Sequence, residues 1–196
     1  AKQLNIDAPI THYLPQYAKW SHVTVRQLLN QTSGIYDYID TPNWFDDLAE
    51  HPDKVWNANE LITIAYQNPN YFKPGQGWHY SNTNYVLLGT ILEKVTGKSI
   101  AENFSAQFFK PLKLNQSFYV SGIIPENIKG KLVPGYYGKI EVSNQNPSWS
   151  QASGGIIATT QDIALWFYDL MNAKVLSAQA FTMMTRLVSN ANGSPV

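Results

Sequence analysis

Three adjacent polar residues, Tyr80, Ser81 and Asn82, stand where a helix is expected to begin. A phenol can give or take a proton, and a primary amide can both donate and accept hydrogen bonds. The first turn of a helix leaves backbone N–H groups unpaired, which suits a reactive site. The same pattern suits a structural role in which Ser81 or Asn82 only caps the helix, and the local pattern alone favours this cap.

The elements that would position this tripeptide are predicted to be mostly helical. A Pro74-Gly75 turn precedes it, and apolar residues at helical spacing follow it, so we expect a helix over 81–96 that ends at Gly97. Further helices are predicted to begin at N-cap residues, namely Thr24, Asn57, Ser99, Thr159 and Ser177. The favoured pair of strands is a hairpin of 132–137 with 139–142. Because no repeat or linker is visible, residues 1–196 are predicted to form one domain.

The composition excludes several classes of function. The chain has 196 residues, and 14 basic residues balance 14 acidic ones, so nucleic acid and acidic membranes are poor candidate partners. It has no Cys, and its four His residues show no His-x-x-x-His spacing, so neither a metal nor another cofactor is expected. No apolar run approaches the roughly 18 residues that a membrane span needs.

Other polar and aromatic residues favour structural roles. The motifs Gly-x-Ser-x-Gly, His-Glu-x-x-His and Gly-x-Gly-x-x-Gly are absent. Ser33 follows a helix and precedes Gly34, which favours a turn over a nucleophile. Gly154 and Gly155 are predicted to allow a close backbone approach or a positive φ. Five tryptophans could form a carbohydrate platform, but packing is favoured; these are Trp44, Trp56, Trp78, Trp149 and Trp166.

Three ordered segments together carry a family resemblance. Residues 23–35 include Thr32-Ser33-Gly34, residues 72–98 include Tyr80-Ser81-Asn82, and residues 153–162 begin Ser-Gly-Gly. In this order and at these separations they resemble the serine β-lactamase and penicillin-binding-protein-like family. The nearest branch is that of class C β-lactamases, D-alanyl-D-alanine carboxypeptidases and related esterases. The resemblance covers nearly the whole chain, although Gln31 stands where relatives often have His.

The resemblance implies a mainly α fold. It would be the helical domain of the β-lactamase/transpeptidase-like fold, with short hairpins and long loops and with most of the core antiparallel sheet missing. The family's Ser-x-x-Lys nucleophile motif and its later Lys-Thr-Gly or His-x-Gly motif are absent from the sequence. We therefore expect residues 1–196 to be a central fragment of a larger serine hydrolase. By resemblance, this bacterial enzyme would be periplasmic or secreted.

The resemblance also implies roles for individual residues. Tyr80 would be the catalytic phenol that shuttles protons, Asn82 would hydrogen-bond the substrate amide, and Ser81 would line the pocket. Gly154 and Gly155 would be structural residues near the site. A free phenol has a pKa of about 10, so Tyr80 should stay neutral without the lysines of the two absent motifs. The parent enzyme would act through an acyl-enzyme on β-lactams, D-Ala peptides or esters, and this chain alone is expected to be inactive.

Two non-enzymatic readings remain open. One is a helical module that binds peptidoglycan-like ligands or a protein partner, and the other is a glycan binder that uses the aromatic residues. Whether the chain is part of an enzyme or a binding module, a helical domain without its sheet would expose an apolar face. We therefore expect self-association through the face that the sheet would cover.

Overall fold

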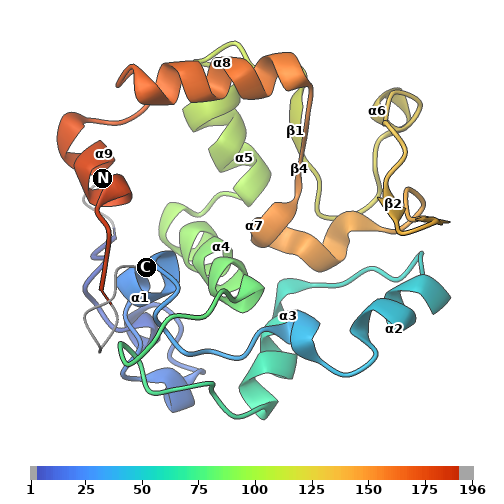
Figure 1. Cartoon of the computed structure of the whole chain (residues 1–196). Coiled ribbons are helices and arrows are strands. Elements are labelled where there is room, and N and C mark those ends of the chain that lie inside the picture. The colour runs from blue at the N-terminus through green and yellow to red at the C-terminus, as the bar shows by residue number, and fades with distance from the viewer. Residues whose placement is uncertain (1–3, 190–196) are drawn as a thin grey trace.

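The computed structural model describes residues 4–189, and most of them lie in or between short helices (Figure 1). The helices are α1 Val25–Leu29, α2 Trp44–Glu50, α3 Ala58–Gln67, α4 Asn82–Thr96, α5 Ile100–Phe104, α6 Glu126–Lys129, α7 Gln151–Gly154, α8 Thr160–Met171 and α9 Ala178–Thr185. A π-helical turn, Ser105–Phe109, continues α5. The 3-10 turns are Ile10–His12, Ala18–Trp20, Tyr38–Asp40 and Pro147–Ser150.

The strands of the described residues form two small antiparallel pairs. β1 Ser117–Tyr119 pairs with β4 Ile156–Ala158, with Phe118 opposite Ile157. β2 Tyr136–Tyr137 pairs with β3 Ile140–Glu141. The second pair is the predicted hairpin, reduced to two residues on each strand. The expectation of a mainly α chain with short hairpins is therefore confirmed for residues 4–189.

The predicted helix starts are confirmed by their hydrogen bonds. Complete capping boxes begin α1, α3 and α5, where Thr24, Asn57 and Ser99 pair with the third helical residue. Thr159 and Ser177 accept hydrogen bonds from the first turns of α8 and α9. These side chains satisfy N–H groups that the helix itself leaves unpaired, which is why they mark its start in the sequence.

Several elements were not predicted, among them the short helices α6 and α7. α2 has no side-chain cap, because its N-cap residue Asn43 is left-handed at φ +62°, and the usual start signal is therefore missing. The β1–β4 pair joins three-residue segments about forty positions apart, and such segments are too short to show an alternating pattern.

The buried core lies in the first half of the chain and surrounds α4. Its fully buried large side chains include Trp20, Tyr38, Leu28, Leu61 and Leu87. α4 contacts α1, α3 and α7 and occupies the middle of the molecule (Figure 1). Because packed neighbours surround α4, the backbone at its N-terminus has a defined position.

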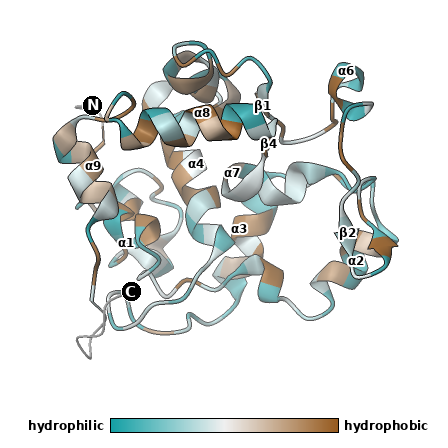
Figure 2. Cartoon of the chain, turned by 45° about the horizontal axis from the view of Figure 1, so that its top comes forward, coloured by the Kyte–Doolittle hydropathy of each residue, from teal (hydrophilic) through white to brown (hydrophobic). Residues whose placement is uncertain are grey.

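α8 and α9 carry apolar residues that the chain does not bury. α8 lies across the top of the view in Figure 1, away from α1 and α3, and hydrophobic residues occur along its length (Figure 2). Exposed residues there include Ile163, Phe167 and Met171, and those of α9 include Met183 and Met184. Of the described helices, none is long and apolar enough to cross a membrane.

Candidate active-site corner at the start of α4

Ser81 occupies the N-cap position of α4, but its side chain makes no capping hydrogen bond, so the predicted cap is wrong. Its hydroxyl is buried and donates instead to the carbonyl oxygen of Tyr36 at 3.3 Å. Asp37 caps the helix from a different segment, since its Oδ2 accepts the backbone N–H of Asn82 at 2.9 Å. A carboxylate at a helix N-terminus is also favoured by the helix dipole.

Asn82 is held twice by the same carboxylate. Its side-chain Nδ2 donates to Asp37 Oδ2 at 2.8 Å, beside the backbone N–H that donates to the same oxygen. Asp37 is itself only 2% exposed. Burial raises the pKa of this carboxyl, and the nearby Asp40 charge raises it further, while hydrogen bonds from Asn82 and Ile39 oppose the shift. The amide of Asn82 thus has a fixed partner on one side.

Gln31 joins the loop after α1 to the start of α4. Its backbone is left-handed at φ +63°, and its Oε1 accepts the Ser81 N–H at 3.0 Å and also a hydrogen bond from Asn84 Nδ2. The backbone oxygen of Gln31 accepts the His79 N–H at 3.1 Å. Its Nε2 is buried without a partner among the described residues. The residue that departs from the family pattern therefore has a structural role in this chain.

Ser33 and Gly34 complete this junction. Ser33 is buried, donates to Asn84 Oδ1 at 2.7 Å and accepts the Ile35 N–H at 3.1 Å, so its predicted turn role is confirmed. Gly34 has φ +74°, and a Cβ there would lie 2.2 Å from the backbone oxygen of Phe72. Only glycine fits such a close approach.

Tyr80 projects its ring partly into solvent, with 47% of the residue exposed. Burial of the remainder raises the pKa of its phenol above the ordinary value, and Tyr85 and Asp37 add to the shift. No cation contributes, so the prediction of a neutral phenol agrees with this environment. At neutral pH the group can donate a proton but is a poor base.

Tyr38 connects this corner to the 3-10 turn Pro147–Ser150 before α7. Its hydroxyl donates to the backbone oxygen of Trp149 at 2.7 Å and lies 3.4 Å from Ser153 Oγ. Its backbone N–H donates to Thr83 Oγ1 at 3.2 Å. Burial raises the pKa of this phenol far above its usual value, so it serves as a neutral structural donor.

The glycine pair at the end of α7 differs in part from the prediction. Neither Gly154 nor Gly155 has a positive φ, so of the two alternatives predicted for them only a close backbone approach is left. A Cβ on Gly155 would lie 2.8 Å from the Gln151 oxygen and 2.9 Å from the Val120 oxygen, which confirms a close backbone approach there. Gly154 has room for a side chain, because its nearest neighbour, Ser150, lies at 3.4 Å. Their role near the active site stays a prediction.

The tryptophans mostly pack. Trp44 and Trp56 are buried with ring centroids 4.9 Å apart, and Trp149 and Trp166 are partly buried. Only Trp78 of the five is exposed, at 47%. Packing is therefore confirmed for four of them, and they form no exposed platform.

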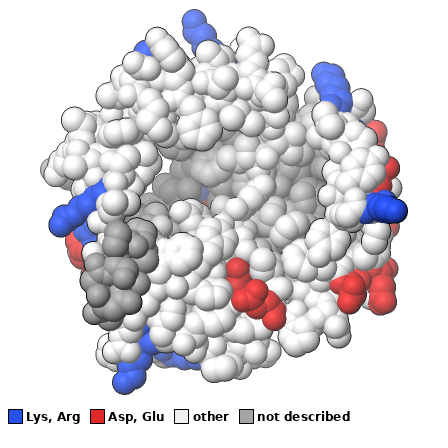
Figure 3. All heavy atoms as spheres, in the orientation of Figure 1, with Lys and Arg blue, Asp and Glu red and all other residues white. Residues whose placement is uncertain are grey.

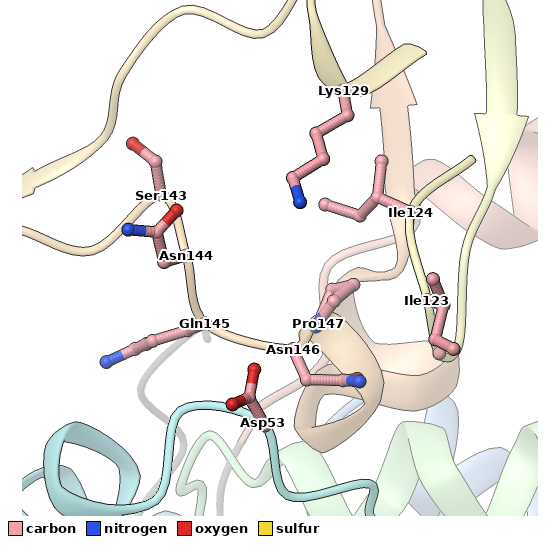
Figure 4. Close-up of a pocket in the computed structure, with 10 residues that line it drawn as sticks. Asp53, Ile123, Ile124, Lys129, Ser143, Asn144, Gln145, Asn146 and Pro147 are labelled. Atoms are coloured by element: carbon pink, nitrogen blue, oxygen red, sulfur yellow. The ribbon is translucent and has the colours of Figure 1, made fainter. Parts of the chain in front are cut away.

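Two cavities lie outside this corner. A polar cavity of about 250 Å³ has Asp53 on one wall and Lys129 on the opposite wall, with both side chains turned towards the space between them (Figure 4). An apolar cavity of about 300 Å³ is lined by residues of α5, the π-helical turn after it and α8, which include Phe104, Phe108 and Trp166. In the view of Figure 3 the surface is hollowed near its centre, and most of the Lys, Arg, Asp and Glu side chains that can be seen lie away from this hollow. Within residues 4–189, no three His, Asp or Glu side chains gather to hold a metal.

Asp37 and the role of Gln31 were missed by sequence reasoning. Asp37 stands 45 positions before Asn82, and no local spacing links the two residues. The order of the family-like segments was the one signal that could have brought these residues together. It implies that residues 23–35 and 72–98 both lie next to the same site. The predicted site residues Tyr80, Ser81 and Asn82 do lie together at the start of α4.

The family resemblance is confirmed by comparison with known proteins. The family model described as Beta-lactamase matches residues 1–195, and the chain belongs to that family. Penicillin-binding protein 4* of Bacillus subtilis (strain 168) is 36% identical over 129 residues, which are 64% of this chain and 27% of that protein. Teichoic acid D-alanine hydrolase of Staphylococcus aureus is 25% identical over 179 residues, covering 89% of this chain and 42% of the relative.

Solved structures show the same fold. A D-stereospecific amidohydrolase from Streptomyces sp. superimposes with a TM-score of 0.87 at 31% identity, covering 96% of this chain and 60% of that one. The D-amino acid amidase of Ochrobactrum anthropi SV3, complexed with L-phenylalanine, superimposes with a TM-score of 0.78 at 26% identity. This match covers 91% of this chain and 51% of the amidase. This chain thus spans between 27% and 60% of the length of these relatives.

Proposed function

We propose that this chain supplies one wall of the active site of a serine hydrolase that acts through an acyl-enzyme. The observation that carries the proposal is the corner at the start of α4, where Tyr80 and Asn82 are placed by Asp37 and Gln31. This corner occurs in a chain of the Beta-lactamase family. We also propose that Gly154 and Gly155 lie near this site, since α7, which ends at Gly154, packs against α4.

Tyr80 would transfer protons in this reaction. A serine oxygen attacks the substrate carbonyl, and the leaving amine or alcohol takes a proton as the bond to it breaks. A half-exposed neutral phenol can give that proton. To take a proton from the serine it needs nearby cations that lower its pKa. We propose that the serine and these cations come from Ser-x-x-Lys and Lys-Thr-Gly or His-x-Gly segments outside the present sequence.

The substrate class that we propose is D-aminoacyl amides and esters. Three relatives carry names that point this way, namely a teichoic acid D-alanine hydrolase, a D-stereospecific amidohydrolase and a D-amino acid amidase. β-Lactams and D-Ala peptides are the alternatives within the same mechanism. Names that refer to penicillin binding and teichoic acid favour a periplasmic or secreted location. The exposed apolar residues of α8 would pack on the sheet of the complete protein.

Hydrolysis assays test this proposal. We would clone the longest reading frame that contains this chain and measure release of p-nitroaniline from D-alanine p-nitroanilide, its L-isomer and, separately, nitrocefin turnover. We expect activity on the D-isomer, with kcat about 10²- to 10⁴-fold lower in Tyr80→Phe. The matched control is Tyr137→Phe, since Tyr137 is 70% exposed on the β2–β3 hairpin.

Two outcomes would contradict the proposal. One is an unchanged kcat in Tyr80→Phe of the longer protein. The other is turnover by the 196-residue chain alone that Tyr80→Phe abolishes, because the nucleophile would then lie within this sequence. A reading frame without Ser-x-x-Lys, together with a change in tryptophan fluorescence on adding D-alanyl-D-alanine, would favour the binding module instead.

A further inference from the structure

The amide of Asn82 has one engaged end and one free end. Its Nδ2 donates to Asp37 Oδ2 at 2.8 Å. Its Oδ1 has no hydrogen-bond partner among the described residues, and it is not one of the buried unpaired atoms, so it is accessible to solvent. The two ends of an amide differ only in being donor or acceptor, so its orientation decides what a ligand meets.

An ionised Asp37 permits only one of the two orientations. Its carboxylate is an acceptor on both oxygens, and Oδ2 already receives the backbone N–H of Asn82 at 2.9 Å. Turning the Asn82 amide by 180° would place Oδ1 against this oxygen and leave two acceptors in contact. Because Asp37 is buried, that repulsion would be poorly screened by water.

We propose that Asp37 is the positioning residue that fixes the orientation of the Asn82 amide, so that the site offers Asn82 Oδ1 as an acceptor. The group that this oxygen takes is an N–H or ammonium donor of the complete site. This inference rests on the proposed function for the identity of the ligand. The hydrogen-bond geometry at Asp37 carries the positioning itself.

Protonation of Asp37 should reverse the arrangement. A neutral carboxyl can donate to Asn82 Oδ1, which frees Nδ2 to turn outward as a donor. The titratable groups around Asp37 are Asp40, Tyr71, Tyr80 and Tyr38, and His79 stacks on Tyr71 with ring centroids 3.9 Å apart. Asp37 takes part in no ion pair among the described residues. Burial and Asp40 move its pKa upward, so the reversal should occur at a higher pH than for an ordinary aspartate.

The test is a pH titration of the side-chain amide of Asn82 by ¹H–¹⁵N NMR on the 196-residue chain. The resonance pair is assigned by its loss in Asn82→Ser. We expect both proton shifts to follow one titration with a midpoint above the ordinary aspartate pKa of about 3.9. In Asp37→Asn, which keeps an acceptor for the helix N–H, the titration should vanish. In the matched control Asp40→Asn it should persist with a lower midpoint, because a neighbouring negative charge is removed.

Several results would overturn the inference. The inference is overturned if the two Asn82 amide proton shifts of the wild-type chain do not change between pH 3 and pH 8, and this result needs no variant to fold. It is also overturned if the titration is still seen in Asp37→Asn. The measurement needs no turnover, so it is independent of the hydrolysis assays. If the titration holds while hydrolysis of D-aminoacyl amides fails in the longer protein, only the proposed function is lost.

Discussion

The region around α4 buries its apolar residues, whereas the region of α8 and α9 leaves many of them exposed. In the first region, buried apolar side chains drawn from the stretch between Ile10 and Ile91 form one cluster. The large side chains of this cluster are almost fully buried. In the second, α8 buries Leu170 but exposes Phe167 at 53% and Met171 at 61%. Both regions have clear helix caps, so the difference lies in packing and not in local helix formation.

This difference shows which part of the molecule can position a site by itself. The corner at Tyr80 and Asn82 rests on the closed core, with Asp37 and Gln31 fixing the first turn of α4. α8 has its own anchor, because Asp162 Oδ2 accepts from Gln116 N and Ser117 Oγ, each at 2.8 Å. Its outward face has no such support and is the natural place for further structure to pack.

The largest expected effect comes from matched leucine truncations in the two regions. Leu87 of α4 is fully buried, so Leu87→Ala should lower the free energy of unfolding by about 2–5 kcal/mol. Leu165 of α8 is 40% exposed, and Leu165→Ala should change the free energy of unfolding by less than about 1 kcal/mol. Urea unfolding followed by circular dichroism measures both. If both variants lost the same unfolding free energy, the two regions would not differ in how well their apolar residues are packed.

A smaller effect is expected at the anchor of α8. Asp162→Ala leaves the buried Ser117 hydroxyl and the Gln116 N–H without their acceptor, which should cost about 1–3 kcal/mol of unfolding free energy. Asp46→Ala in the exposed first turn of α2 is the control and should stay within about 0.5 kcal/mol. If the two variants are equally stable, Asp162 does not hold α8 against β1.

The smallest effect concerns self-association. We expect the chain to form dimers through the exposed face of α8, and the double variant Phe167→Ser, Met171→Ser to weaken them by roughly tenfold or more, since each buried apolar side chain contributes on the order of 1 kcal/mol. Light scattering over a concentration series gives the dissociation constants. Tyr136→Ser is the control, because Tyr136 is 63% exposed on the β2–β3 hairpin. A wild-type monomer at all concentrations would contradict the expectation.

Local signals in the sequence predicted the helices well because the signal and its cause lie within a few residues. The capping box of Thr24 with Gln27 and the left-handed Gly97 after α4 are examples. The position of the corner at Tyr80 followed from the same local pattern, combined with the order of the family-like segments.

Interactions between distant segments were not predictable in this way. Asp37 replaces Ser81 as the cap of α4 across 45 positions, and Gln31 reaches Ser81 across 50. Between these two residues the chain passes through Gly34, whose positive φ and close approach to Phe72 only the folded chain defines. α2 was missed for a different reason, since Asn43 makes no side-chain cap.

The central claim is that this chain holds one polar corner of an active site, in which the phenol of Tyr80 remains neutral. The most direct test is an NMR titration of the Tyr80 ring carbon Cζ in ¹³C-tyrosine-labelled chain, assigned through Tyr80→Phe. Because burial, Tyr85 and Asp37 all disfavour the phenolate, we predict a midpoint above the ordinary phenol pKa of 10.0. A midpoint below that value would mean that the chain itself supplies the activating cation, and would contradict the account.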